Sequence, residues 1–216
     1  MTTPVADAAN PEVVDVVFRL HSGRLPIDQA YALFHGICAT LPWLTDEASA
    51  RVHQVHTAAT GSGWVRPDAS ADDELHLSRR TKLKLRLPQH RVEDALALSG
   101  QAMDIAGYSL TPGDGKAIGL SPASTLLARF VACEEQEEET DFVQRLTQTL
   151  NASGVSGATL ICGRVHRIAT PETDVHTRSV VVTNLDPDGA MALQRNGIGP
   201  AGNLGCGIFI PYKHIA

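Results

Sequence analysis

The chain has 216 residues, of which 43% are hydrophobic and 19% charged, and its formal net charge is −6. This length fits one large domain or two domains of about 100 residues each. No apolar run approaches the roughly 18 residues of a membrane-spanning helix, and the N-terminus lacks the basic and apolar regions of a secretory signal. We therefore expect a cytoplasmic protein with no membrane partner. The four cysteines form no Cys-x-x-Cys pair, which argues against a zinc ribbon and a disulfide framework.

The first half of the sequence alternates between strand-like and helix-like patterns. The predicted elements are a strand at 12–20, an amphipathic helix at 25–41, a strand at 74–87, a short helix at 92–101 and a strand with a turn at 101–112. Residues 45–73 lack periodicity and contain a GSG turn, and the GDG at 113–115 is typical of a turn that ends this half.

The second half repeats the pattern. The predicted elements are strands at 125–133, 157–170, 177–185 and 206–211, with helices at 141–154 and 186–197. Both halves fit the order β-α-β-β-α-β of ferredoxin-like domains. We therefore predict an α+β protein of two tandem ferredoxin-like domains, at residues 12–112 and 118–212.

Charge is unevenly distributed along the chain. Residues 134–141, EEQEEETD, carry six acids, which equals the surplus of 24 acidic over 18 basic residues. The predicted strand at 74–87 places leucines on one parity and cations on the other, so one of its faces is basic. The cations around it are Arg79, Arg80, Lys82, Lys84 and Arg86. Such a surface binds nucleic-acid phosphates, and the alternative is a solvated face that protects a sheet edge.

Residues 196–211, NGIGPAGNLGCGIFIP, gather glycines directly before the last predicted strand. These are Gly197, Gly199, Gly202, Gly205 and Gly207. Glycine permits positive φ and close approach of the backbone. The segment is therefore either a tight turn before a strand or a loop whose amides lie against phosphates.

The helix entry LPIDQAYAL, the strand LSRRTKLKLRLP and the C-terminal GIGPAGNLGCGIFIP resemble the repeat-RNA-processing endoribonucleases of CRISPR systems, within the RAMP superfamily. The resemblance covers nearly the whole chain and is closest to the compact type I, Myxococcus-type processors. It implies CRISPR repeat RNA as the partner, with other effector subunits as further partners, and a reaction that needs neither metal nor cofactor. The 2′-hydroxyl attacks its own phosphorus and leaves a 2′,3′-cyclic phosphate. The resemblance also implies that Gly199, Gly202, Gly205 and Gly207 face the RNA.

This chemistry needs a base, an acid and groups that stabilise the developing charge on phosphorus. Relatives often carry a histidine directly after the Asp of LP-x-D, where this chain has Gln29. The catalytic candidates are instead His35, one helical turn after Tyr31, and His53 downstream of the helix, with Tyr31 assisting. Each histidine could equally be structural.

Two alternatives stay open from the sequence. The first is a related RNA-binding subunit that no longer cleaves, which the Gln29 departure favours. The second is a regulatory ferredoxin-like module for a small metabolite, which would leave the basic residues unexplained.

Overall fold

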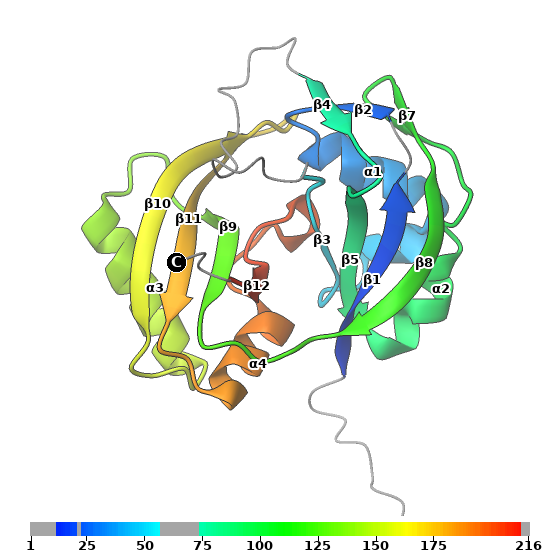
Figure 1. The fold of residues 1–216 in the computed structure, drawn as a ribbon. Helices are drawn as coiled ribbons and strands as arrows, with labels where there is room; N and C mark the ends of the chain where they lie inside the picture. The colour runs from blue at the N-terminus through cyan, green and yellow to red at the C-terminus, as the bar shows by residue number, and fades with distance from the viewer. Residues whose placement is uncertain (1–11, 21–22, 57–73, 213–216) are drawn as a thin grey trace, which may run out of the picture.

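The computed structural model describes residues 12–20, 23–56 and 74–212. Within these residues the chain forms two four-stranded antiparallel sheets that lie side by side (Figure 1). The first has the order β3-β5-β1-β8 and the second the order β10-β11-β9-β12. Counted along the chain within each sheet, both orders are 2-3-1-4, so the predicted class of two tandem ferredoxin-like units is confirmed.

In its described residues, the first half holds one principal sheet, two α-helices and two small two-stranded sheets. Its elements are β1 (Val13–Leu20), β2 (Gly23–Pro26), α1 (Ala30–Thr40), β3 (Arg51–Val52), β4 (Glu74–Leu77), β5 (Lys82–Pro88), α2 (Val92–Leu96), β6 (Met103–Ile105), β7 (Tyr108–Leu110) and β8 (Pro112–Gly119). The leucines of β5 are buried with Val16 and Phe18 of β1 and with Leu33 and Ile37 of α1 in one core.

The second half holds the other sheet and two helices. Its elements are β9 (Leu126–Ala132), α3 (Glu139–Ala152), β10 (Thr159–Ile168), β11 (Val175–Thr183), α4 (Pro187–Asn196) and β12 (Phe209–Pro211). Pro187 starts α4, and the side chain of Asp186 caps the helix by accepting a hydrogen bond from the Gly189 amide at 2.7 Å.

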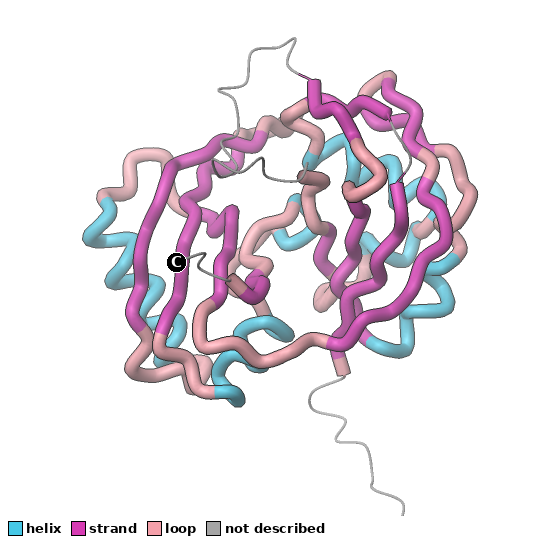
Figure 2. The backbone as a smooth tube through the Cα atoms, in the orientation of Figure 1, coloured by secondary structure: helices cyan, strands magenta, loops and turns pink. Residues whose placement is uncertain are grey.

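Each sheet is covered by helices on one face, whereas its other face is turned away from them (Figure 2). In the second half, Phe142, Leu146 and Leu150 of α3 share a core with Val180 and Val182 of β11. The first core also takes in side chains of the second half, so the two halves are packed together. These side chains are Phe130, Ile168, Leu204 and Cys206.

Three local predictions were wrong. The predicted strand at 74–87 is two strands, because residues 78–81 turn and the Thr81 amide donates to the Ser78 carbonyl at 2.9 Å. The predicted helix at 25–41 starts only at Ala30, because residues 23–26 pair with β4 instead. The GDG at 113–115 is not a turn but part of β8, and a Cβ on Gly115 would lie 2.5 Å from the Phe18 ring, so this glycine makes room for an aromatic core residue.

The GSG turn predicted within residues 45–73 lies outside the described residues. Among the helices that the structure describes, none is long and apolar enough to cross a membrane.

Candidate functional site

The face of the first sheet that is turned away from the helices is basic. Lys82 and Arg19 are opposite each other on β5 and β1, and Val17 of β1 has Lys84 on one side and Lys116 of β8 on the other. Because side chains alternate along strands, these four cations share the face opposite the buried leucines. Arg19 and Lys116 are exposed, and the two lysines of β5 are half-buried.

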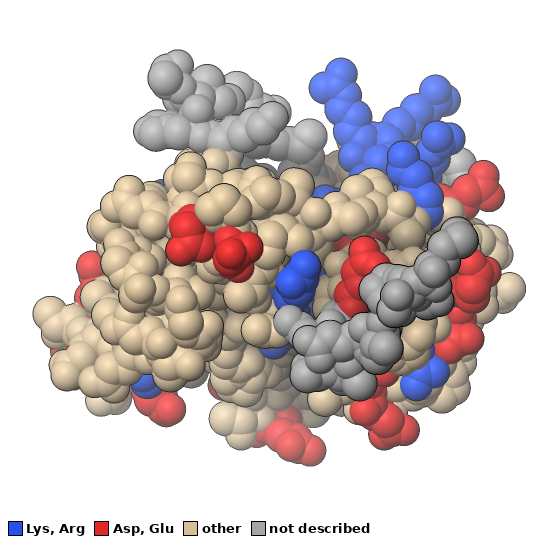
Figure 3. Space-filling model, turned by 90° about the horizontal axis from the view of Figure 1, so that it is seen from below, with Lys and Arg blue, Asp and Glu red and all other residues tan. Residues whose placement is uncertain are grey.

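This basic face overlaps with the predicted one but is not identical to it. Figure 3 shows Lys and Arg side chains gathered on one side of the half that holds the first sheet. Arg79 and Arg80 are exposed in the turn before β5, and the Lys82 ammonium donates to the Arg79 carbonyl at 3.4 Å. The sequence alone does not indicate that Arg19 and Lys116 belong to this face, because only strand pairing places them beside Lys84.

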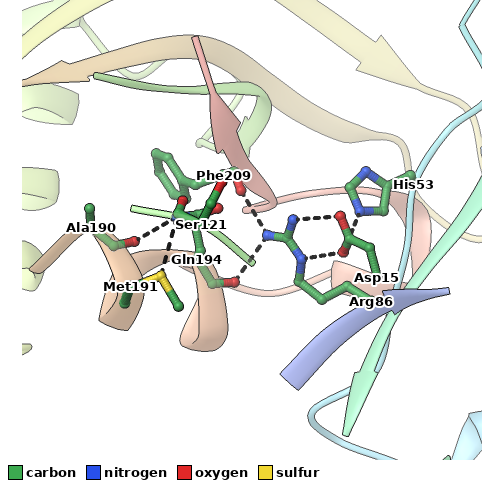
Figure 4. A network of polar contacts seen from close by, with 8 residues as sticks. All are labelled: Asp15, His53, Arg86, Ser121, Ala190, Met191, Gln194 and Phe209. Atoms are coloured by element: carbon green, nitrogen blue, oxygen red, sulfur yellow. Dashed lines mark hydrogen bonds and ion pairs between the residues drawn. The ribbon is translucent and has the colours of Figure 1, made fainter. Parts of the chain in front are cut away.

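Arg86 lies on the same face of the sheet as Lys82 and Lys84, but its side chain is only 1% exposed, so it does not contribute to the basic surface. It forms a bidentate pair with Asp15, with N–H···O distances of 2.8 and 3.1 Å. It also donates to the carbonyls of Gln194 and Phe209 in the second half, at 3.0 and 2.7 Å (Figure 4). These acceptors occupy the guanidinium, so the proposed RNA-binding set below omits Arg86.

His53 belongs to the same buried cluster. Its Nε2 lies 3.6 Å from the Asp15 carboxylate, beyond hydrogen-bond distance, and finds no hydrogen-bond partner among the described residues. Burial lowers the pKa of His53 and outweighs the opposite effect of Asp15, so the ring is neutral at pH 7. Burial would raise the pKa of Asp15, but the contacts with His53 and Arg86 lower it well below its usual range. The closer partner, Arg86, holds this carboxylate ionised.

His35 and Tyr31 lie together on α1, as their spacing predicts. Their ring centroids are 4.0 Å apart, and His35 is exposed. The His35 Nδ1 lies 2.9 Å from the Tyr31 carbonyl oxygen. Since a carbonyl can only accept, this contact places the hydrogen of the neutral ring on Nδ1. The tautomer that results keeps a lone pair on Nε2, which can accept a proton.

Gln29 is buried directly before α1, at 1% exposure. Its amide nitrogen donates to the Val55 carbonyl at 3.0 Å, and its carbonyl oxygen accepts from the Val55 amide at 3.3 Å. This double contact ties the segment after β3 to the start of α1. Gln29 therefore fixes the backbone that carries the nearby histidines.

One aromatic cluster between the halves was not found from the sequence. Phe130 of β9 stacks with His56 at 6.0 Å between ring centroids and meets His166 of β10 edge-on at 5.6 Å. His56 follows β3 in the first half, so the cluster joins the two halves. Spacing along the chain gave no signal, because the three residues come from distant elements.

Close packing explains four of the five glycines near the C-terminus. A Cβ on Gly197 would lie 2.7 Å from the Arg51 guanidinium, and one on Gly202 would collide with the same group. A Cβ on Gly207 would collide with the Ile198 carbonyl, and one on Gly205 would lie 3.0 Å from the Gln54 side chain. These positions need glycine to pack the segment against β3 and against itself.

Gly199 differs from the other four, since a Cβ there would meet no atom of the described residues within 4 Å. It is exposed, with φ +75°. Together with Gly202, Arg51 and Phe34 it lines a pocket of about 230 Å³. The ring centroids of Phe34 and His35 are 5.3 Å apart, so His35 adjoins the α1 residue that lines this pocket, although His35 and Tyr31 do not line it themselves.

Comparisons with known proteins agree with this architecture. The family model described as Cas6 Crispr matches residues 14–214. A CRISPR-associated endonuclease Cas6 from Myxococcus xanthus (strain DK1622) is 29% identical over 198 residues, which are 92% of this chain and 81% of that protein.

Solved structures share the fold at low sequence identity. One described as CRISPR associated protein Cas6 has a TM-score of 0.66 at 10% identity and covers 94% of this chain and 100% of its own. Another, described as an RAMP protein binding different RNA substrates, has a TM-score of 0.65 at 14% identity, covering 93% of this chain and 100% of its own. The family model spans both sheets, the α1 pair and the glycine-rich segment, and the chain thus belongs to the Cas6 family of CRISPR proteins.

Proposed function

We propose that the protein is an endoribonuclease that cleaves CRISPR repeat RNA to give mature guide RNA. In this reaction the 2′-hydroxyl beside the scissile bond attacks its own phosphorus, the bond to the 5′-oxygen breaks, and a 2′,3′-cyclic phosphate and a 5′-hydroxyl remain. Because the nucleophile belongs to the substrate, the protein needs only proton carriers and charge stabilisation, and the reaction proceeds without a metal ion. Family membership and the endonuclease name of the Myxococcus relative support this reaction class.

The observation that carries the proposal is the pocket where α1 meets the glycine-rich segment. His35 lies beside its Phe34 wall. In the tautomer described above, His35 Nε2 takes the proton of the 2′-hydroxyl. Tyr31 holds the ring through a tilted ring contact and through its carbonyl. The open backbone at Gly199 provides an approach for the phosphate.

His53 ranks behind His35 as the proton carrier. Its side chain is only 14% exposed, and it sits beside a carboxylate and two cations inside the protein. A general base must come within about 3 Å of the hydroxyl or reach it through one water. An RNA strand would have to displace the Asp15–Arg86 pair to bring a hydroxyl that close.

RNA binding is assigned to the basic face of the first sheet and the turn before β5. The residues are Arg19, Arg79, Arg80, Lys82, Lys84 and Lys116. Helix α1 covers the opposite face of this sheet. An RNA that contacts both the basic face and His35 must therefore pass around the sheet, and the glycine-rich segment beside β3 lies on such a path.

The test is single-turnover cleavage of a repeat-containing RNA in EDTA, with affinity measured separately. Losing a positioned proton carrier typically lowers the rate by about 10²- to 10⁴-fold. We expect His35→Ala to do so with nearly unchanged affinity, and Tyr31→Phe to keep most of the rate because the backbone carbonyl remains. His90→Ala is the matched control, since the His90 side chain is 61% exposed and its ion-pair partner is Glu47. Parental cleavage by His35→Ala would remove this histidine from the mechanism.

A second candidate function is a non-cleaving RNA-binding subunit of a CRISPR effector complex. The observation in its favour is Gln29, which stands where the resemblance leads us to expect a histidine and which is used entirely in backbone hydrogen bonds. Tight binding of cognate RNA by the parent without any cleavage would select this function.

A further inference from the structure

The halves are held together by two arginines that lie side by side on the first sheet. Arg51 of β3 and Arg86 of β5 are cross-strand partners. Both reach into the second half, and both end on backbone carbonyls. Arg86 is bonded to carbonyls of α4 and β12, as described above. Each arginine therefore joins two separate elements of the second half to one sheet of the first.

Arg51 makes the same kind of contact with different carbonyls. It donates to the Asn196 carbonyl at 2.6 Å and to the Cys206 carbonyl at 3.3 Å. Asn196 is the last residue of α4, and Cys206 belongs to the glycine-rich segment. Gly197 and Gly202 leave the space that the Arg51 guanidinium fills. The glycine-rich segment is thus shaped around an arginine of the other half.

The acceptors at the end of α4 favour both contacts. The C-terminal end of a helix carries partial negative charge on its free carbonyls, and both arginines lie at the end of α4. A guanidinium offers five N–H donors in a fixed plane, so it can bind several carbonyls at once, which an ammonium cannot do in the same way. Among the described residues, the ion pairs include an Asp15–Arg86 pair but none to Arg51. Arg51 is therefore held by carbonyls and packing.

We propose that Arg51 and Arg86 are positioning residues that fix the orientation of the second half relative to the basic face of the first sheet. This inference rests on the proposed function, because the fixed orientation matters for an RNA that contacts both halves. Neither arginine needs to touch the RNA. The clasp, as we name this pair, acts by keeping the glycine-rich segment beside α1 and β3.

The experiment measures the orientation of the halves without RNA, from residual dipolar couplings of the full chain, and RNA affinity separately. Arg51→Gln is the principal variant, because it leaves no buried carboxylate unpaired. Arg86→Lys is the second, since it keeps the charge beside Asp15 but loses the planar fork. Arg91→Gln is the control, because the ion-pair partners of Arg91, Glu47 and Asp94, belong to its own half.

We expect Arg51→Gln to keep both sheets, to change or broaden the orientation of the halves, and to weaken RNA binding by about 10-fold, roughly the loss of one net hydrogen bond to a charged group. Arg91→Gln should change neither quantity. A parental orientation in both arginine variants would overturn the inference whatever their RNA affinity. A changed orientation with parental affinity would overturn the link to RNA. If the parent binds no RNA, the proposed function fails, and the orientation measurement still decides whether the clasp exists.

Discussion

His53 shows how the surroundings of a residue decide what it can do. The sequence places it where a catalytic histidine is plausible, whereas the fold places it among Asp15, Arg86 and Lys84. Burial keeps its ring neutral, and a neutral buried histidine beside a salt bridge makes protein stability depend on pH. His53 is therefore more useful as a reporter of folding than as a candidate general base.

We expect the free energy of unfolding to fall as the pH is lowered from about 6.5 towards 5. The native state resists protonation of His53, whereas the unfolded chain takes up a proton near pH 6.5, so the unfolded state binds more protons in this window. One such group contributes a slope of at most about 1.4 kcal/mol per pH unit. The lowered pKa of Asp15 stabilises the native state at pH values above the usual range of carboxyl pKa values. This contribution is lost only as the pH falls through the pKa that Asp15 has in the folded state, which lies below the window from pH 6.5 to 5.

Urea unfolding of the parent and of His53→Gln at several pH values measures this contribution. The other histidines are common to both proteins, so their effects cancel in the difference. His53→Gln should have the flatter dependence between pH 6.5 and 5. Equal slopes would show that burial does not depress protonation of His53.

At the scale of elements, the basic face depends on three paired strands. Lys84, Val17 and Lys116 form one row across β5, β1 and β8. The alternation of side chains along β5 predicted which face of the sheet its lysines occupy. The contribution of β8 could not be predicted, because the GDG within it resembles a turn and its pairing with β1 is a long-range contact.

Removing charge from this row should reduce the salt dependence of RNA binding. Each phosphate contact to a single strand contributes about 0.7 to the slope of log affinity against log salt. Lys84→Gln with Lys116→Gln should therefore flatten the slope by about 1.4. Arg91→Gln with Arg145→Gln removes the same charge near the helices and should leave the slope nearly unchanged. If both double variants flatten it equally, binding responds to net charge and not to this face.

For the whole molecule, the order of elements could largely be predicted, because helix and strand patterns are local properties of the chain. The contacts between the halves could not. Arg86 and its carboxylate partner are 71 residues apart, and nothing along β5 distinguishes it from the lysines beside it. The sequence shows only that many glycines gather in this segment. Four of them are needed because Arg51 and neighbouring backbone leave no room for a larger residue, and only the folded chain brings these groups close.

The clasp also has a consequence for the order in which the chain folds. The two hydrogen bonds from Arg86 to backbone carbonyls join residues that are separated along the chain by 108 and 123 positions. Closing such long loops costs more entropy than closing short ones, and chains form local contacts faster than distant ones. The β10–β11 pair, whose strands follow each other along the chain, should therefore form before the halves dock, and the docked surface should open before this pair unfolds. Amide hydrogen exchange would show this as stronger protection in the middle of β11 than at the end of α4, whereas equal protection would mean that the halves unfold as one unit.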